Sequence, residues 1–393
     1  MSLITHEHSI YFLGIGGIGM SALARYFIVK GYEVHGYDKT ETELTLTLEK
    51  EGMQIHYHED ISLIPFNTGM VIFTPAVPND NTEFIYLKNS GIRMLKRAEV
   101  LGMLSSEYKT IACAGTHGKT TTSTLVSHLM HQSSIGCQAF LGGISRNFNN
   151  NLLVSETSEF MVVEADEYDR SFLHLHPQIA IITSVDSDHL DIYHSHDAII
   201  QAFSNFAGNI LPEGALIVKK GIETAFTLPE KRHVYTYAVN EKADFYADNL
   251  KLVKGLYNFD FHYPAGMISS VTLGIPGLYN VENSVAAMAA VLLAGLTPDE
   301  ISTGLSSFRG VKRRFDIRYN ENGRIYIDDY AHHPEELNAC IRSAKAMFPE
   351  SRITGIFQPH LFSRTRDFAD DFAKSLDQLD EILLLPIYPA REK

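Results

Sequence analysis

Two glycine-rich segments of this chain have the residue types that hold phosphate groups. The first, Gly14-Ile15-Gly16-Gly17-Ile18-Gly19, follows an apolar run and precedes a stretch of helical spacing, and Asp38 ends the next apolar run. Glycines at such a turn let the backbone approach a diphosphate at a helix N-terminus, and the acid then contacts a ribose. The pattern predicts a bound nucleotide diphosphate without saying which nucleotide. The alternative is a tight turn with a purely structural role.

The second segment, Gly115-Thr116-His117-Gly118-Lys119-Thr120, lies between an apolar run and a helical stretch that starts near Thr121. In such a loop the backbone N–H groups surround phosphates, Lys119 reaches the β- and γ-phosphates, and the Thr120 hydroxyl binds Mg²⁺. The segment is shorter than the usual phosphate-loop pattern, whose first glycine falls here on Cys113. It still predicts a nucleotide triphosphate site, and the alternative is a glycine-rich turn with a solvated lysine.

Two acidic clusters also follow apolar runs. Glu164-Ala165-Asp166-Glu167 comes after Phe160–Val163, and Asp186-Ser187-Asp188-His189-Leu190-Asp191 comes after Ile179–Ser184. Ligands bind at the C-terminal ends of parallel strands, and buried carboxylates need cations or water. We therefore expect Glu164 to be a metal ligand and His189 to complete a Mg²⁺ or Mn²⁺ site. The alternatives are a solvated acidic turn and a structural histidine.

A further group of charged side chains lies near the C-terminal end. Asp328-Asp329-Tyr330-Ala331-His332-His333-Pro334 follows a short apolar run, Lys312-Arg313-Arg314-Phe315 precedes it, and Gln358-Pro359-His360 and Ser363-Arg364-Thr365-Arg366 come later. Arginine pairs with phosphate or carboxylate through a planar fork. In an acidic chain, this concentration of arginines and histidines indicates an anion site. Scattered surface salt bridges are the alternative.

The elements that must position these groups follow from the hydrophobic pattern. Short apolar runs alternate with amphipathic stretches of helical length, such as Met20–Lys30 and Thr42–Glu51. This alternation predicts an α/β fold of right-handed βαβ units with helices on both faces of parallel sheets. Leu256–Tyr263 and Ile268–Leu273, separated by a turn, predict a small antiparallel sheet. The expected parallel strands are Ser9–Leu13, Tyr32–Tyr37, Met70–Thr74, Ile92–Leu95, Thr110–Ala114, Phe160–Ala165, Ile179–Ser184, Ala215–Val218, Arg324–Asp328 and Ile382–Leu385.

The composition excludes several classes of protein. The net charge is −14 and 45% of the 393 residues are hydrophobic, which disfavours a general nucleic-acid-binding surface but allows sizeable cores. The cysteines Cys113, Cys137 and Cys340 form no CxxC pair, which argues against a disulfide framework or a structural zinc site. No apolar run reaches the ~18 residues of a membrane span. We expect a cytoplasmic protein that binds neither nucleic acid nor membrane.

The ordered set of motifs resembles the Mur ligases of peptidoglycan synthesis, and the resemblance covers the whole chain. Any one motif is moderate evidence, but their common order is highly specific. The segments that carry it are FLGIGGIGMSALA, TPAVPNDNTE, RAEVLGML, AGTHGKTTT, EADEYDRSF, SDHLDIY, PGLYNVENSVAA, GVKRRFD, DDYAHHP and FQPHLFSRT. The resemblance implies a UDP-sugar, not NAD, on the first glycine turn, and ATP on the second.

The resemblance also implies roles for individual residues. The UDP-sugar site would contain Gly14, Gly16, Gly17, Gly19, Ser21, Asp38, Thr74 and Arg97. The ATP site would contain Gly115, Thr116, His117, Gly118, Lys119, Thr120, Thr121, Asn280 and Asn283, with Thr120, Glu164 and His189 on the metal. Arg314 and Asp328 would approach ATP from the third domain, and His332, His360, Arg364 and Arg366 would form the amino-acid pocket. Lys119, Glu164, His189, Arg314, Asp328 and His332 would then be the catalytic set.

Within the family, the motifs are most similar to the branch that attaches L-alanine to UDP-N-acetylmuramate through an acyl phosphate. A branch that attaches an intact peptide is the nearest alternative. An NAD-dependent oxidoreductase and a non-catalytic P-loop scaffold are alternatives of another class. Two departures from the family pattern stand out: Ser184 replaces an asparagine that is frequent in relatives, and no lysine between Leu190 and Val218 is available for carbamylation.

At roughly 150 residues per domain, the chain length suggests two or three domains, and the motifs favour three in series. We expect a Rossmann-like UDP-sugar domain at 1–107 and a central P-loop domain at 108–310. The rest, 311–393, would be a partial Rossmann-like amino-acid-binding domain. Because such a domain is expected to need more than ~100 residues, we expect this one to be incomplete in the given chain. A monomer or a weak homodimer is expected.

Overall fold

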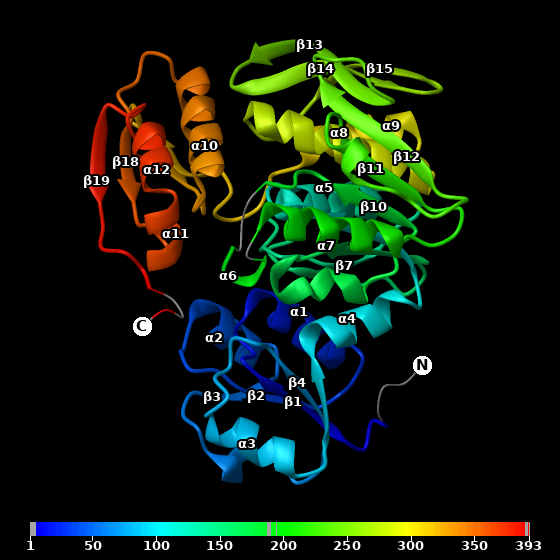
Figure 1. The fold of residues 1–393 in the computed structure, drawn as a ribbon, viewed down its shortest axis with the longest axis vertical. Helices are drawn as coiled ribbons and strands as arrows, with labels where there is room; N and C mark the ends of the chain where they lie inside the picture. Colours follow the sequence, from blue (N-terminus) through cyan, green and yellow to red (C-terminus); the bar gives the residue numbers. More distant parts are fainter. Residues whose placement is uncertain (1–4, 187–189, 194, 390–391, 393) are drawn as a thin grey trace.

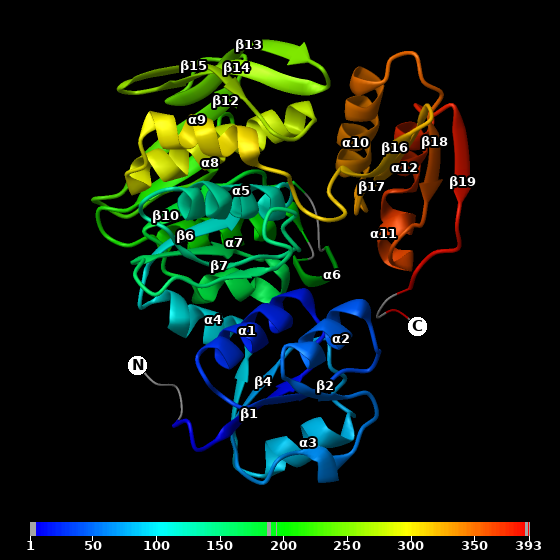
Figure 2. The ribbon, with the colours of Figure 1, turned by 180° about the vertical axis from the view of Figure 1, so that it is seen from behind.

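The computed structural model describes residues 5–186, 190–193, 195–389 and residue 392. Figure 1 shows three groups of elements, with the N-terminal group at the bottom, the central group above it and the C-terminal group beside the central one. The view from behind in Figure 2 gives the same arrangement, with helix α10 facing the central group. The α/β class with parallel sheets is thus confirmed.

The N-terminal group is a five-stranded parallel sheet in the order β3-β2-β1-β4-β5. Alternate residues of β1 explain why it is covered on both faces. Ile10 and Phe12 pack in the cluster that contains helix α1, while Tyr11 and Leu13 pack with Leu87 of α3. The bounds are β1 (Ser9–Leu13), α1 (Ile18–Val29), β2 (Val34–Tyr37), α2 (Glu43–Lys50), β3 (Gln54–His56), β4 (Thr68–Phe73), α3 (Thr82–Asn89), β5 (Arg93–Lys96) and α4 (Arg97–Ser105).

The central group is a ten-stranded sheet in the order β15-β14-β13-β12-β11-β10-β6-β9-β7-β8. Strands β13 to β15 are joined by antiparallel pairs, as the hairpin pattern predicted. Its strands are β6 (Lys109–Ala114), β7 (Gln138–Phe140), β8 (Leu152–Leu153), β9 (Phe160–Glu164), β10 (Ile179–Ile182), β11 (Ala215–Lys219), β12 (His233–Val239), β13 (Phe245–Val253), β14 (Leu256–Tyr263) and β15 (Gly266–Thr272). Its helices are α5 (Lys119–Gln132), α6 (Leu190–Tyr193), α7 (His196–Gly208), α8 (Leu278–Ala294) and α9 (Pro298–Ser307).

The C-terminal group differs from the expected single parallel series. Strand β17 pairs antiparallel with β16, and among the described strands of this group only β18 and β19 form a parallel pair. The reason is the turn Asn322-Gly323, whose two residues both have positive φ and which therefore closes a tight hairpin. The bounds are β16 (Asp316–Glu321), β17 (Arg324–Asp328), α10 (Pro334–Met347), β18 (Thr354–Phe357), α11 (Phe362–Asp367), α12 (Ala369–Leu376) and β19 (Glu381–Leu384).

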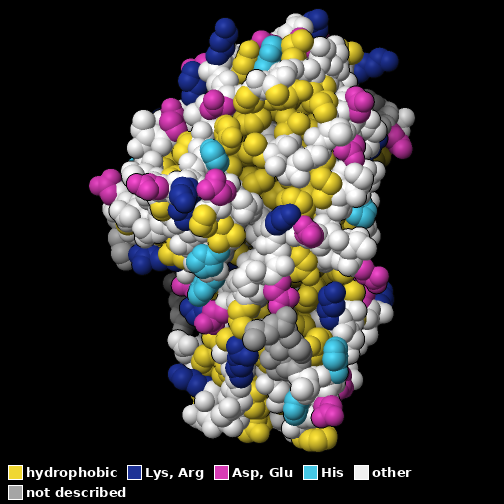
Figure 3. All heavy atoms as spheres, turned by 90° about the vertical axis from the view of Figure 1, so that its right-hand side faces the viewer, with side chains coloured by type: hydrophobic (Ala, Val, Ile, Leu, Met, Phe, Trp, Pro, Cys, Tyr) yellow, Lys and Arg dark blue, Asp and Glu magenta, His cyan; other side chains and the backbone are white. Residues whose placement is uncertain are grey.

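The surface carries charges of both signs. On the face drawn in Figure 3, Lys and Arg side chains are scattered among Asp and Glu, with apolar side chains between them. Among the described helices, none is long and apolar enough to cross a membrane.

Candidate active site at the phosphate-binding loops

The loop between β6 and α5 has the backbone geometry of an anion cradle. Helix α5 begins at Lys119 after Gly118, which has φ of 82° and gives no side-chain cap. The N–H groups of the first turn are therefore available to an anion. Gly115 has φ of 133°, and a Cβ there would collide with the Thr183 side chain. Only glycine fits at this position, so the loop can stay tight against β10.

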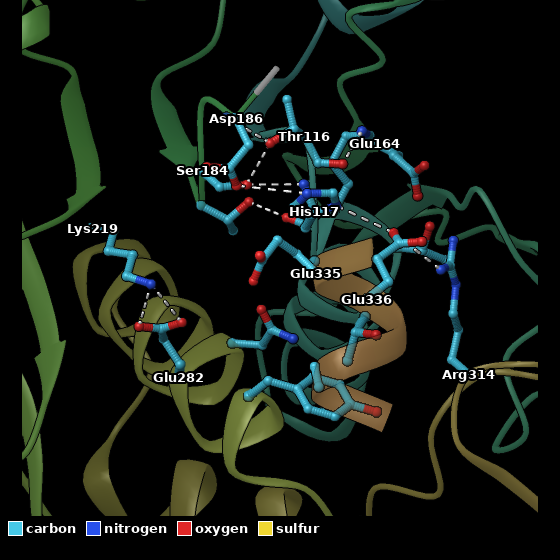
Figure 4. Close-up of a pocket in the computed structure, with 18 of the residues that line it drawn as sticks. Thr116, His117, Glu164, Ser184, Asp186, Lys219, Glu282, Arg314, Glu335 and Glu336 are labelled. Atoms are coloured by element: carbon cyan, nitrogen blue, oxygen red, sulfur yellow. Dashed lines mark hydrogen bonds and ion pairs between the residues drawn. The ribbon is translucent and has the colours of Figure 1, made fainter. Parts of the chain in front are cut away.

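A cavity of about 490 Å³ opens beside this loop (Figure 4). Its wall comes from the loop Gly115–Thr120, called the P-loop from here on, from the ends of β9, β10 and β11, from α8 and from the first turns of α10. The cavity therefore lies between the central and C-terminal groups. The lining residues are Thr116, His117, Gly118, Lys119, Thr120, Thr121, Glu164, Thr183, Ser184, Asp186, Lys219, Tyr237, Tyr279, Glu282, Asn283, Arg314, Asp329, His332, Glu335, Glu336 and Ala339.

The Lys119 ammonium is held by groups of its own loop and by a buried carboxylate. Its Nζ donates to Gly115 O at 2.7 Å, to Thr116 O at 3.4 Å and to Glu167 Oε1 at 2.8 Å. Glu167 is only 1% exposed. Burial opposes the ammonium charge, but Glu167, Asp166 and Glu164 together raise the pKa of Lys119 above its usual value. Lys119 is therefore a fixed cation at the floor of the cavity.

Glu164 has the surroundings of a cation ligand. Its Oε2 is buried and accepts no hydrogen bond from the described residues, and burial raises the pKa of the carboxyl. A Cβ at Gly142 would collide with this carboxylate, so the glycine makes room for it. A buried carboxylate oxygen without a donor favours a hard divalent cation, and Thr120 on the adjacent helix turn lines the same cavity. Glu164 and Thr120 thus fit a magnesium ion.

The expected third metal ligand, His189, lies outside the described residues. Within the described ranges, no three His, Cys, Asp or Glu side chains are close enough together to hold a metal ion. The segment just before it is described, and it ties the P-loop to the end of β10. Ser184 Oγ lies 2.8 Å from Thr116 Oγ1 and accepts the His117 N–H at 2.9 Å, so the serine makes polar contacts with the P-loop.

The C-terminal group contributes a carboxylate directly to the P-loop. Glu336, on the first turn of α10, lies with Oε1 3.3 Å from His117 Nδ1 and 3.9 Å from Arg314 Nη1. Its Oε2 accepts the His332 backbone N–H at 3.0 Å. Burial opposes ionisation, but His117, His332 and Arg314 hold the pKa of Glu336 well below its usual range. Glu336 therefore stays charged and contacts His117, Arg314 and His332.

Asp329 lines the cavity, whereas Asp328, the expected contact, does not. Asp328 Oδ1 lies 4.0 Å from Arg313 Nε at the end of the β16–β17 hairpin. Asp329 accepts the backbone N–H groups of Phe315 at 2.6 Å and of Ala331 at 2.7 Å. These bonds hold the residue just before β16 against the loop that precedes α10. Burial raises the pKa of Asp329 to about 6. Asp328 is the last residue of β17, and Asp329 is the first residue after the strand.

The far end of the cavity is formed by α8 and β11. Asn283 lines this end of the cavity. Its Oδ1 lies so close to Gly118 that a Cβ on this glycine would collide with it. Lys219 Nζ pairs with Glu282 Oε1 at 2.9 Å beside it. Asn280 does not line the cavity, because its side chain donates to Pro276 O at 2.6 Å. Of the two expected asparagines, only Asn283 faces this space.

The first glycine turn forms a second anion cradle on the N-terminal sheet. Helix α1 begins after Gly17 without a side-chain cap. The Gly16 N–H donates to Asp38 Oδ2 at 2.7 Å, so Asp38 braces the turn. A Cβ at Gly19 would lie 2.9 Å from Arg97 Nη1, which places the guanidinium over the helix N-terminus. The Thr74 side chain packs closely on Gly14, where a Cβ would lie 2.6 Å from Thr74 Cγ2.

Ser21 does not face this cradle. It is fully buried and its Oγ donates to Ile18 O at 2.9 Å. The same oxygen accepts from Asn151 Nδ2 at 3.0 Å, and Asn151 Oδ1 in turn accepts from Arg25 Nη1 at 2.5 Å. Ser21 therefore belongs to the contact between α1 and the central group.

The acidic segment after β9 lies between the two cradles. Asp166 Oδ2 is 3.9 Å from Arg97 Nη2, and Asp169 Oδ2 is 3.2 Å from Lys96 Nζ. One segment thus contacts Arg97 over the first cradle and, through Glu167, Lys119 in the second. Asp169 adopts φ of 51°, a left-handed conformation that is uncommon for a residue with a side chain.

Three of the four residues expected in the amino-acid pocket are neighbours. The His332 and His360 rings are 6.0 Å apart, and His360 Nδ1 lies 3.3 Å from Arg364 Nη1. Arg364 is buried. Arg366 lies apart from them, since its exposed side chain pairs with Asp367 at 2.7 Å.

Sequence reasoning missed Glu336, Asp329 and Glu167 as members of this site. Glu167 stands in the same acidic motif as Glu164, but only the fold shows which carboxylate meets Lys119. Acidic residues in the first turn of a helix are common for electrostatic reasons alone, so Glu336 gave no signal.

Three family models match consecutive parts of the chain. The model described as "Mur ligase family, catalytic domain" matches residues 9–109, "Mur ligase middle domain" matches 113–291, and "Mur ligase, glutamate ligase domain" matches 313–393. Together they span all three groups of elements.

Curated relatives match over nearly the whole chain. The UDP-N-acetylmuramate–L-alanine ligase of Phocaeicola vulgatus is 51% identical over 391 residues, which cover 98% of this chain and 85% of the relative. The enzyme of the same name from Porphyromonas gingivalis is 48% identical over 389 residues, with coverage of 98% and 85%.

Solved structures show the same fold. The UDP-N-acetylmuramate-alanine ligase of Thermotoga maritima matches with a TM-score of 0.83 and 29% identity, over 97% of this chain and 85% of that chain. A murein peptide ligase from Psychrobacter arcticus matches with a TM-score of 0.74 and 21% identity, over 96% and 91%. With three family models and relatives at about half identity, the chain belongs to the Mur ligase family.

Proposed function

We propose that this protein is an ATP-dependent ligase that joins L-alanine to the lactyl carboxylate of UDP-N-acetylmuramate, giving ADP and phosphate, in peptidoglycan synthesis. The observation that carries the proposal is the pair of anion cradles, at Gly14–Gly19 and Gly115–Thr120, linked by one acidic segment through Arg97 and Lys119. A ligase that activates a carboxylate with ATP must hold ATP and the carboxylate substrate close to each other, and two linked anion cradles fit this requirement. The name shared by the relatives at 48–51% identity supports the choice of L-alanine.

The substrates then have distinct places. The diphosphate of UDP-N-acetylmuramate lies on the α1 N-terminus under Arg97, with Thr74 and Asp38 bracing the turn. ATP lies in the cavity with its phosphates on the α5 N-terminus and its adenine side toward Asn283. L-Alanine binds beside His332, His360 and Arg364.

The chemistry follows from the bond that must be made. A carboxylate is a poor electrophile toward an amine, so the γ-phosphate is first transferred to it, which gives an acyl phosphate and ADP. The amine of L-alanine attacks the acyl carbon, and phosphate leaves. Lys119 and Arg314 neutralise charge on the transferring group, and Mg²⁺, when bound by Glu164 and Thr120, neutralises charge on the phosphate oxygens. Catalysis is mainly positioning and needs no protein nucleophile.

The domain limits and the cellular setting belong to the same proposal. We place the UDP-sugar domain at 1–107, the ATP domain at 108–310 and the amino-acid domain at 311–393. The enzyme would act in the cytoplasm, where both ATP and UDP-linked sugars are made, as a monomer or weak homodimer. It would bind neither nucleic acid nor membrane.

The test measures phosphate release with UDP-N-acetylmuramate, ATP and Mg²⁺, offering L-alanine, glycine, L-serine or a tripeptide as the acceptor. We expect the highest kcat/KM with L-alanine. A preference for the tripeptide would instead identify the branch that attaches intact peptides. Carboxylate labelled with ¹⁸O in UDP-N-acetylmuramate should deliver one label to the released phosphate, because the acyl phosphate loses that oxygen; unlabelled phosphate would refute the acyl-phosphate route.

A further inference from the structure

Glu336 is a side chain of the C-terminal group that forms an ion pair with the P-loop, at His117. It stands on the first turn of α10, and Figure 4 shows it between His117 and Arg314 at the edge of the cavity. One oxygen meets His117 at 3.3 Å, and the other accepts the His332 N–H at 3.0 Å. The His332 ring Nδ1 also lies 3.4 Å from this second oxygen.

These contacts join two sites that the proposed reaction keeps apart. His117 belongs to the loop proposed for ATP, and His332 belongs to the pocket proposed for the amino acid. A buried carboxylate is stable only when it is paired and hydrogen-bonded, and each partner here comes from one of the two sites. The Glu336 carboxylate therefore needs both His117 and His332 as partners. Through it, the position of each of these two histidines affects the other.

The remaining neighbours of His117 do not replace this link. Asp186 Oδ2 lies 3.6 Å from His117 Nε2, and the His333 ring is 4.8 Å away. The phosphate cradle itself is held differently, because the His117 backbone N–H donates to Ser184 and not to α10. Loss of Glu336 would thus leave the loop backbone in place but free the start of α10.

We propose that Glu336 is a positioning residue that holds the amino-acid pocket against the nucleotide loop through His117 and His332. This rests on the proposed function, since it assigns the coupling between two of its substrate sites. Glu336 touches neither the UDP-sugar cradle nor Lys119. The backbone N–H of His117 donates to Ser184, so we expect loss of Glu336 to affect binding of the amino acid more than binding of ATP.

The test compares steady-state constants of the wild type with Glu336→Gln, which removes the charge but keeps an oxygen that accepts from His332. We expect KM for L-alanine to rise about tenfold, equivalent to about 1.4 kcal/mol. KM for ATP and for UDP-N-acetylmuramate, and kcat, should stay within about threefold, because Ser184 and not Glu336 holds the backbone of the ATP loop at His117. The control is Glu350→Gln, which removes the same charge from an exposed site just after α10 and should change nothing.

An unchanged KM for L-alanine in Glu336→Gln would overturn the proposal, and so would an equal rise of all three KM values, which indicates a general structural loss. If the Tm shows that Glu336→Gln does not fold, Glu336→Asp keeps the charge with a shorter reach and should raise the same KM alone. If the wild type itself releases no phosphate in response to L-alanine, the proposed function is refuted. That result is distinct from an unchanged KM in Glu336→Gln.

Discussion

At the scale of residues, the cations of the cavity are already paired with carboxylates of the protein. Lys119 pairs with Glu167, and His117 and Arg314 pair with Glu336. A phosphate anion entering the cavity must compete with these partners. Its advantage is that the backbone N–H groups of the α5 N-terminus serve the phosphate and not the carboxylates. The cationic side chains Lys119, His117 and Arg314 are therefore held in defined positions by carboxylates of the protein.

Asp329 provides a pH-dependent test of this burial. Its pKa of about 6 in the folded protein exceeds its usual value of 3.8, so the native state holds a proton that the unfolded chain releases between these values. Its contribution to stability is full below pH 4 and is lost as the pH rises through 6. Asparagine cannot titrate. The free energy of unfolding of the wild type relative to Asp329→Asn should fall by about 3 kcal/mol from pH 4 to pH 7.

Urea unfolding of both proteins, followed by circular dichroism at several pH values, measures this difference. A difference that stays constant between pH 4 and pH 7 would show that Asp329 titrates normally and is not desolvated.

At the scale of elements, the two anion cradles are helix N-termini without side-chain caps. Helices α1 and α5 both begin after a glycine that offers no cap, whereas α2, α7 and α9 are capped by threonine or serine side chains. An uncapped N-terminus leaves several N–H groups unpaired. Helix α8 also begins after an uncapped glycine, Gly277, so a missing cap alone does not mark a ligand site; the glycine-rich motifs before α1 and α5 distinguish these two helices.

Gly115 is the residue of the second cradle that tolerates substitution least. In Gly115→Ala, the new Cβ would meet the Thr183 side chain, and alanine is strained at φ of 133°. We expect the loop to shift and the Kd for ATP, measured by calorimetry, to rise by about tenfold or more. Gly208→Ala is the control, because a Cβ at this helical position meets nothing within 4 Å. Equal Kd values for Gly115→Ala and the wild type would contradict the geometry of the loop.

Much of the fold could be predicted from buried apolar runs. Strands β1, β6, β9, β10 and β17 lie within two residues of their expected bounds, because each run is apolar and ends in a motif. Strand β3, Gln54-Ile55-His56, was missed because it is a short, polar edge strand. The β16–β17 hairpin was missed although Asn322-Gly323 is a strong hairpin signal.

The candidate site was predictable only in its local motifs. The P-loop, Glu164 and the first glycine turn carry their own pattern in the chain. Ser21 and Asp328 were placed by resemblance, and the fold puts the first in a domain contact and the second outside the cavity wall. Glu336 meets His117 across more than two hundred residues, a distance over which local pattern carries no information.

At the scale of the whole molecule, the N-terminal and central groups pack as one unit. One apolar cluster contains residues of α1 and α4 together with residues of the central sheet, and Tyr26 of α1 packs on Phe140 at 5.5 Å between ring centres. The C-terminal group has a small core of its own, around Leu337 and Phe357. It contacts His117 of the P-loop through the Glu336 carboxylate and the His333 ring. Closure of the third domain on a fixed pair of domains is the motion that this packing favours.

The most direct test of the account is the substrate dependence of phosphate release. The proposed function brings the UDP-sugar, ATP and the amino acid into one reaction, so release should require UDP-N-acetylmuramate, Mg²⁺ and L-alanine together. Omission of any one should reduce the rate to background. Equal rates with and without UDP-N-acetylmuramate would contradict the account, because the chain would then hydrolyse ATP without using its first cradle.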